Sequence, residues 1–207
     1  MTTAEYRRMI AGAQSRVAGA TFEGMIETSL QWYEEREILK AKKTPEPMKP
    51  LGKPDAQGHF RACYTKAAQV DFSGTMIGGR SVRFEAKQTS SDRFERKRLT
   101  DEQMDDLRGN EKLGALCFVL LCFDLDRFYR VPWRIWDNMK AEYGRQYVTE
   151  ADLQIYRIPY VAGVIKILDG IAGINTIPDI CVACGTYAGE GRHICPACER
   201  RAKGETA

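Results

Sequence analysis

The spacing of apolar residues predicts a helix near the start of the chain. Between Thr21 and Leu39, apolar side chains recur at the spacing of one helix face, and Thr21 is a suitable N-cap. These apolar positions are Phe22, Ile26, Leu30 and Tyr33. The stretch that follows, AKKTPEPMKPLGKPDAQGH, contains four of the eight prolines, so we expect a loop or an extended arm there.

Strands dominate the middle of the sequence. Three short strand candidates follow the arm, and Gly78-Gly79, between the last two, is typical of a hairpin turn. The candidates are Cys63–Phe72, Ser73–Ile77 and Arg80–Gln88. The sequence from Thr100 to Gln103 fits a capping box, which predicts a helix that ends near Gly109 or Leu113.

The second half of the chain predicts a fully buried strand with a neighbour. Ala115–Phe123 is an uninterrupted apolar run, and Arg127–Trp133 has the pattern of an adjacent strand closed by Pro132. Helices are expected over Arg134–Tyr143 and Thr149–Ile155, before a last apolar stretch, Tyr160–Leu168. This order of elements predicts the α/β class, with a mixed β-sheet flanked by helices.

Length and composition fit one full-sized domain with a small appendage. The chain has 207 residues, of which 43% are hydrophobic and 29% charged, and this excludes wholesale disorder. Its longest apolar run, nine residues, is too short to span a bilayer. The first residues, MTTAEYRRMIAGAQSRVAG, lack the apolar region of a secretory signal. We therefore expect a cytoplasmic protein with no membrane segment.

The charge is unevenly distributed although the formal net charge is only +3. Arg36–Lys66 carries eight basic and three acidic residues, and Gly79–Arg98 carries seven and three. Leu99–Leu153 reverses the balance, with seven basic and eleven acidic residues. Basic segments of this kind favour binding to a polyanion, driven by counterion release. Ordinary solvated faces are the alternative.

Four of the seven cysteines form two CxxC pairs near the C-terminus. Cys181 and Cys184 are followed, after ten residues, by Cys195 and Cys198. Four thiolates at this spacing suit the tetrahedral coordination of a structural Zn²⁺. The segment from Cys181 onward has too few apolar residues to fold without such a cross-link. We predict a zinc ribbon; a redox dithiol or paired disulfides are the alternatives.

The segment SVRFEAKQT carries the candidate chemistry. If it is a strand, Glu85 and Lys87 project from the same face, because side chains alternate along a strand. A hairpin at Gly78-Gly79 would bring the carboxylate of Asp71 beside Glu85. Two neighbouring carboxylates favour Mg²⁺, and a nearby lysine stabilises developing phosphoryl charge. A surface strand with an ordinary salt bridge is the alternative.

The register of that hairpin decides whether the two carboxylates share a face. A symmetric two-residue turn at Gly78-Gly79 pairs Asp71 with Ala86 and directs its side chain to the wrong face. We therefore predict an odd-length loop or a bulge between Asp71 and Glu85.

From about Gly19 to Ile171, the sequence resembles the RecU-type Holliday junction resolvases, a branch of the PD-(D/E)XK nuclease superfamily. The segments that carry the resemblance are, in order, ATFEGMIETSL, AKKTP, YTKAAQVDFSGTMIGGRSVRFEAKQT, LTDEQMDDL, GALCFVLLCF and RFYRVPW. The resemblance implies a restriction-endonuclease-like nuclease core over residues 19–175. An N-terminal segment, 1–18, precedes this core, and the zinc ribbon, 178–207, is not part of the usual family chain.

The resemblance also implies roles for individual residues. Asp71 and Glu85 match the acids that bind Mg²⁺, and Lys87 matches the catalytic lysine. Glu23 matches a glutamate of the first helix that supports the metal site, and Gln103 matches a glutamine of the following helix. From the local sequence alone, Glu23 is equally well explained as a solvated helix residue. Locally, Gln103 is better explained as the third residue of the capping box, serving the N-cap rather than the site.

The family forms homodimers that place two active sites on strands of opposite polarity at a four-way junction. Its members carry a stalk that enters the junction centre, and Lys66–Gly79 partly corresponds to that neighbourhood. This chain departs from the family pattern at Gln69 and Val70, where threonines are expected, and its spacing from Asp71 to Glu85 is one residue longer.

Together these observations predict a Mg²⁺-dependent, structure-selective endonuclease that resolves four-way DNA junctions in recombination and repair as a homodimer. Basic residues near the site are candidates for phosphate contacts, which position DNA without reading its bases. They are Lys40, Lys42, Lys43, Lys66, Arg80, Arg83, Arg93, Arg96, Lys97 and Arg98. One alternative is another nuclease of the superfamily, acting on duplex, flap or foreign DNA. The other is a non-catalytic zinc-ribbon protein that binds nucleic acid.

Overall fold

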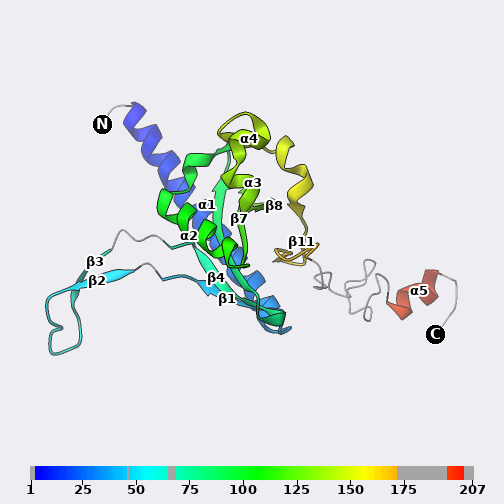
Figure 1. Ribbon diagram of the computed structural model, residues 1–207, viewed down its shortest axis with the longest axis horizontal. Coiled ribbons are helices and arrows are strands. Elements are labelled where there is room, and N and C mark those ends of the chain that lie inside the picture. The colour runs from blue at the N-terminus through cyan, green and yellow to red at the C-terminus, as the bar shows by residue number, and fades with distance from the viewer. Residues whose placement is uncertain (1–2, 46, 65–68, 172–194, 203–207) are drawn as a thin grey trace. The chain divides into compact units, whose positions relative to one another are not determined.

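A six-stranded mixed sheet forms the centre of the protein, as seen in the computed structural model (Figure 1). The strand order is β1-β4-β5-β7-β8-β10, in which β5 and β7 run parallel and the other neighbours run antiparallel. The strands are β1 (Leu39–Lys43), β4 (Phe72–Met76), β5 (Ser81–Thr89), β7 (Leu116–Phe123), β8 (Arg127–Pro132) and β10 (Arg157–Ile158). The predicted α/β class with a mixed sheet is confirmed.

The structure describes residues 3–45, 47–64, 69–171 and 195–202, with side chains of the first helix described from residue 17. The chain divides into two compact units, Met1–Ile167 and Leu168–Ala207. Within the described part of the smaller unit, α5 (Pro196–Ala202) is the helical segment. In the described ranges, no helix combines the length and the apolar character needed to cross a membrane.

Helices cover both faces of the sheet. On one face lies α1 (Thr3–Glu34), whose Phe22 ring is 6.0 Å from that of Phe128 on β8. On the other face, α2 (Asp101–Lys112) and α3 (Trp133–Asp137) pack a core that includes Leu107 and Trp136. Because both faces are covered, β7 is apolar along its whole length, as a buried parallel strand requires.

Shorter elements join these layers in antiparallel pairs. β6 pairs with β9, and β11 pairs with β12. These strands are β6 (Arg93–Glu95), β9 (Tyr147–Thr149), β11 (Tyr160–Val161) and β12 (Val164–Ile165). One further helix is α4 (Met139–Tyr143). Among the described residues, 3-10 turns lie at Ile77–Gly79, Arg96–Arg98 and Ala151–Tyr156.

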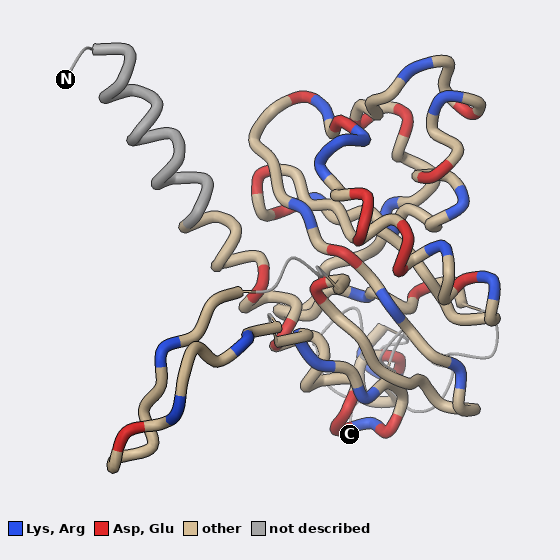
Figure 2. The backbone as a smooth tube through the Cα atoms, turned by 60° about the vertical axis from the view of Figure 1, so that its left-hand side comes forward, with Lys and Arg blue, Asp and Glu red and all other residues tan. Residues whose placement is uncertain are grey.

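β2 (Met48–Leu51) and β3 (Arg61–Tyr64) form a separate antiparallel ribbon, all of whose strand residues are exposed (Figure 1). Figure 2 shows Lys and Arg on both sides of this ribbon. The extended arm predicted from the prolines is confirmed in part: β2 lies within it, whereas its first residues, Ala41–Lys43, belong to β1 of the central sheet and β3 lies beyond its end. The expected stalk neighbourhood, Lys66–Gly79, begins after the ribbon has ended, and much of it is β4 of the central sheet.

The predicted bounds of the first helix are wrong. α1 begins at Thr3, so Thr21 lies inside the helix, where its hydroxyl donates to the carbonyl of Val17 at 2.9 Å. The helix ends at Glu34, and Leu39 already belongs to β1. The apolar positions that define the helix stop at Tyr33, and the alternating burial along LKAKK is that of an edge strand.

Other boundaries differ in smaller ways. Cys63–Phe72 is not one strand, because β3 ends at Tyr64 and β4 begins at Phe72. Arg134–Tyr143 is divided into α3 and α4 at Asn138, and Thr149–Ile155 is the end of β9 followed by a 3-10 turn. Four predicted strands are confirmed to within one residue at each end, namely Ser73–Ile77, Arg80–Gln88, Ala115–Phe123 and Arg127–Trp133.

Gly74 allows β1 to approach β4 closely. A Cβ at this position would lie 2.2 Å from the carbonyl oxygen of Lys40 and 2.4 Å from the Cα of Ala41. Both atoms belong to the backbone, so Gly74→Ala must displace β1 and should lower the free energy of unfolding by about 1–3 kcal/mol in urea denaturation.

The control for this prediction is Gly109→Ala in α2, where a Cβ meets nothing within 4 Å. It should raise the free energy of unfolding by about 0.5–1 kcal/mol, since alanine favours helix over glycine. Equal stability of the two variants would contradict the close approach of β1.

Candidate active site

A three-residue loop, Ile77–Gly79, sets the register that brings Asp71 and Glu85 together. In the pairing of β4 with β5, Phe72 lies opposite Phe84, so one further step along the register places Asp71 opposite Glu85. The two glycines of the loop have φ angles of 82° and 83°, a region that glycine adopts without strain. The predicted odd-length connection is confirmed.

Backbone hydrogen bonds fix both carboxylates. The backbone N–H of Asp71 donates to Oε2 of Glu85 at 3.0 Å, and the backbone N–H of Ala86 donates to Oδ2 of Asp71 at 3.1 Å. Each carboxylate thus accepts a hydrogen bond from the segment that carries the other one. Charge-assisted bonds of this kind hold the side chains in place without a metal ion.

Glu85 is a buried acid with an unusual proton affinity. Its side chain is 0% exposed, and burial, together with the charge of Asp71, raises its pKa to about 7. Lys87 acts in the opposite direction, because its ammonium donates to Oε1 of Glu85. A carboxyl group whose pKa is strongly shifted, and which lies between another carboxylate and a lysine, is typical of a functional site.

Gln103 connects Glu85 to the start of α2. Its Nε2 donates to Oε1 of Glu85 at 2.6 Å, while its Oε1 accepts from the backbone N–H of Thr100 at 3.1 Å. The capping box is completed by the backbone N–H of Gln103, which donates to the Thr100 hydroxyl at 3.3 Å. The capping box is confirmed. The expectation that Gln103 serves the cap rather than the site is corrected, because the two ends of its amide do both.

Glu23, on α1, pairs with the end of β1 rather than with Asp71 or Glu85. Its Oε2 lies 2.5 Å from Nζ of Lys43, the last residue of β1. This hydrogen bond raises the pKa of Lys43, and the charges of Asp71 and Glu27 act in the same direction. Lys43 was expected only as a DNA contact; no signal in the sequence placed it here, because β1 itself was not predicted.

The donor set suits a hard divalent cation. Mg²⁺ is held in proteins by one or two carboxylates together with water and substrate phosphates, and Asp71 and Glu85 supply that pair. In the described ranges, no three Asp, Glu, His or Cys side chains are arranged to hold a metal. The third acid, Glu23, is turned to Lys43. The residues therefore fit Mg²⁺ through the acidic pair.

Most of the predicted DNA contacts have partners within the chain. Lys66 lies outside the described residues, and Arg83 is half-buried on β5, with its guanidinium 3.4 Å from Asp106. Further pairs are Lys40 with Glu34, Arg96 with Asp137, and Lys97 and Arg93 with Glu95, while Arg80 and Arg98 donate to the carbonyls of Gly114 and Gln88. Their role in binding DNA stays a prediction.

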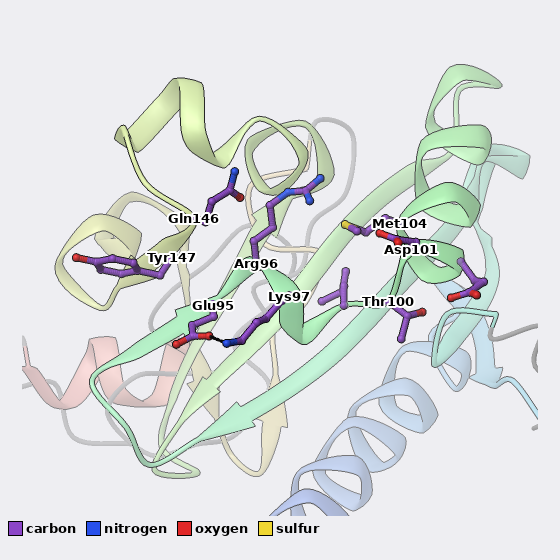
Figure 3. Close-up of a pocket in the computed structure, with 10 residues that line it drawn as sticks. Glu95, Arg96, Lys97, Thr100, Asp101, Met104, Gln146 and Tyr147 are labelled. Carbon is purple, nitrogen blue, oxygen red and sulfur yellow. Dashed lines mark ion pairs between the residues drawn. The ribbon is translucent and has the colours of Figure 1, made fainter.

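A pocket of about 790 Å³ lies between the Glu95–Lys97 segment and the N-terminus of α2 (Figure 3). Figure 3 shows Glu95 paired with Lys97, and Tyr147 is the partner of Glu95 in the pairing of β6 with β9. Asp71, Glu85 and Lys87 do not line it, so the pocket is distinct from the acidic pair. No sequence pattern predicts this pocket, because β6 and β9 have three residues each and are too short to produce one.

The predicted zinc ribbon lies mostly outside the described residues, which exclude Cys181 and Cys184. Cys195 is buried and immediately precedes α5, and the backbone N–H of Cys198 donates to its Sγ at 3.4 Å. Zinc binding therefore stays a prediction.

Comparison with known families decides the assignment. The profile of the family described as RecU, Recombination protein U, matches residues 17–171, three-quarters of the chain. The chain belongs to the RecU family. The match covers α1 from residue 17 onward, the acidic pair, Lys87 and α2, and it ends before the C-terminal cysteines.

Among solved structures, this RecU chain is similar to Hjc of Archaeoglobus fulgidus, a Holliday junction resolvase from an archaeal hyperthermophile. The two share 12% sequence identity with a TM-score of 0.40, and the alignment covers 63% of this chain and 90% of Hjc. No curated protein sequence matches the chain.

Proposed function

We propose that this RecU-family protein is a Mg²⁺-dependent endonuclease that resolves four-way DNA junctions by hydrolysing phosphodiester bonds. The observation that carries the proposal is the convergence of Asp71, Glu85 and Lys87. The register of β4 and β5 places the two acids together, and the pKa of Glu85, raised to about 7, marks a buried carboxylate whose charge a cation would stabilise.

Each residue has a distinct part in the proposed reaction. Asp71 and Glu85 hold Mg²⁺, and Glu23 contributes directly or through water. When bound, Mg²⁺ supplies Lewis-acid stabilisation of phosphoryl charge and lowers the pKa of water. Lys87 orients the attacking water and stabilises the charge that develops on the phosphate. Gln103 holds Glu85 in the orientation that this pair requires.

We further propose that the protein acts as a homodimer on branched DNA. A four-way junction is resolved by two cuts, whereas the described part of one chain carries one such acidic pair, Asp71 and Glu85. The exposed ribbon of β2 and β3 and the basic residues around the site would contact phosphates through charge and shape.

The test is a cleavage assay that compares a mobile four-way junction, a flap and a matched linear duplex. We expect cleavage of the junction in Mg²⁺ and none in EDTA, at a rate clearly above that of the duplex. Asp71→Asn, purified identically, excludes a contaminating nuclease. Equal rates on junction and duplex would instead favour a different nuclease specificity. Activity that is independent of Mg²⁺ and unchanged in Asp71→Asn would remove the enzyme proposal.

The zinc ribbon gives a separate prediction. We expect one Zn²⁺ per chain by elemental analysis, since four thiolates at this spacing fill a tetrahedral site. Chelation, or Cys184→Ser, should unfold the C-terminal segment, measured as faster proteolysis there, while the RecU-matched core keeps its melting transition. Well under one Zn²⁺ per chain, with Cys184→Ser as protease-resistant as wild type, would contradict it.

A further inference from the structure

Adjacent residues of β1 project to opposite faces of the central sheet. Lys43 pairs in register with Phe72 and binds Glu23 of α1, so it lies on the face that α1 covers. Because side chains alternate along a strand, Lys42 and its register partner, Ser73, lie on the other face. This other face carries the acidic pair and is the one that α2 approaches.

On the face of the acidic pair, side chains of three neighbouring strands form two rows. The first row contains the acidic pair, and Thr44 lies beside it, since its backbone N–H donates to the carbonyl of Asp71 at 2.8 Å. The second row, two residues away on each strand, consists of Lys42 on β1, Ser73 on β4 and Arg83 on β5. At about 3.3 Å per residue, the two rows are about 7 Å apart.

The second row is open to solvent where it crosses β1 and β4, and β1 is the edge of the sheet (Figure 1). Lys42 is exposed and Ser73 is half-buried. The hydroxyl of Ser73 lies 3.4 Å from that of Thr44, which links the second row to the first. At the other end of the row, Arg83 is directed to Asp106 of α2, at 3.4 Å. The accessible part of the row is therefore an ammonium beside a hydroxyl.

Lys42 differs from the other two lysines of β1. Those two pair with glutamates of α1, Lys40 with Glu34 and Lys43 with Glu23. In the part of the chain that the structure describes, no carboxylate pairs with Lys42. An ammonium without an internal counter-charge, opposite a hydroxyl that can donate a hydrogen bond, suits a phosphate oxygen.

We propose that Lys42 and Ser73 form a binding subsite for the phosphate next to the scissile one, on the same DNA strand. The inference rests on the proposed function, because it takes the acidic pair as the point of cleavage. A DNA strand carries one phosphate for about every 3.4 Å of helix axis. Because the backbone also winds around that axis, successive phosphates are further apart than this rise, and their separation matches that of the two rows. The subsite therefore sets the line along which the strand crosses β4 and β5.

The test combines one variant with single neutral phosphates. Cleavage in Mg²⁺ first identifies the scissile phosphate. Junctions are then made in which one chosen phosphate of each cleaved strand is a methylphosphonate, and the affinity of the full-length protein for them is measured in Ca²⁺. Neutralising the phosphate in the subsite should weaken binding by wild type about three- to fivefold, the size expected for an exposed ion pair. Lys42→Met should bind the unmodified junction more weakly by the same factor and should not respond to that one methylphosphonate.

Lys43→Met is the matched control, because it removes the same charge from the next residue, whose side chain lies on the opposite face. It should keep the wild-type response to every methylphosphonate. Ser73→Ala changes no charge and should reduce the response to the same phosphate as Lys42→Met. Melting curves establish that each variant folds.

The inference is overturned if Lys42→Met responds to every methylphosphonate as wild type does, or if the phosphate to which it is insensitive is not next to the scissile one. Loss of the same response in Lys43→Met would contradict the assignment of faces and overturn it as well. If wild type cleaves junctions in any of these cases, the proposed function stands and only the subsite falls. If wild type cuts no DNA in Mg²⁺, there is no scissile phosphate and both fall together.

Discussion

Glu85→Gln should abolish Mg²⁺-dependent cleavage of a four-way junction, lowering the single-turnover rate by at least about 1,000-fold. The substitution keeps the size of the side chain but removes a charge that the metal site requires. The oxygens of Glu85 accept hydrogen bonds from three donors, which belong to Asp71, Lys87 and Gln103. An amide cannot replace this carboxylate, because its NH₂ group is itself a donor.

The matched control is Glu95→Gln. Glu95 is also followed, two residues later, by a lysine with which it pairs, Lys97, but its side chain is 36% exposed and the charges that act on it are those of Lys97, Arg93 and Arg98. Its pKa is lowered by Lys97, whereas burial raises that of Glu85. We expect Glu95→Gln to retain the cleavage rate within a few-fold. Retained activity in Glu85→Gln would remove Glu85 from the metal site.

The raised pKa of Glu85 also predicts how the stability of wild type and of Glu85→Gln depends on pH. A carboxyl group whose pKa is about 7 in the folded state, against 4.5 ordinarily, favours folding when protonated. Its contribution is therefore fully present below about pH 4.5 and is lost as the pH rises through 7. At pH 8, Mg²⁺ should raise the melting temperature of wild type, because it compensates the buried charge. Glu85→Gln should show no such rise.

The sequence contains the pattern of the active site twice, as FEAK from Phe84 and as FERK from Phe94. Both phenylalanines are buried, and both glutamates pair with the lysine two residues on. Only the first pair is buried between a central strand and a helix, with a second carboxylate placed by the hairpin register. Periodicity therefore predicts which side chains share a face, but the difference between the two sites depends on long-range packing.

The same reasoning explains which features could be predicted. The odd-length connection could be predicted because Asp71 and Glu85 can share a face only if the loop between their strands has an odd length. The buried strand β7 could be predicted because its residues form a long uninterrupted apolar run. β1 was missed because its first residue, Leu39, was assigned to the end of the helix and Ala41–Lys43 to the start of the arm, and five residues are too few to show a strand pattern. With β1 absent, nothing could place Lys43 beside Glu23, and nothing local indicated that one amide, that of Gln103, reaches two partners.

Lys87→Met should lower the rate of junction cleavage by about 100- to 1,000-fold, while Mg²⁺ still stabilises the protein at high pH. The ammonium of Lys87 donates to Glu85, and the side chain is 21% exposed, so it can reach a phosphate at the edge of the acidic pair. The proposed role predicts a loss in the rate of the chemical step, with little change in DNA affinity. Lys97→Met, at the equivalent place in FERK, should change DNA affinity and leave the chemical step intact.

A rate measurement at raised pH separates two explanations of that loss. Lys87 lowers the pKa of Glu85, so Lys87→Met raises it further and favours a protonated, metal-free site near neutral pH. If ionising Glu85 were the only role of the lysine, cleavage by Lys87→Met would recover at pH 9 with saturating Mg²⁺. We expect no recovery. The negative charge on the phosphate grows during the reaction, and Lys87→Met lacks the ammonium that would stabilise it. Full recovery at pH 9 would reduce Lys87 to a residue that tunes Glu85.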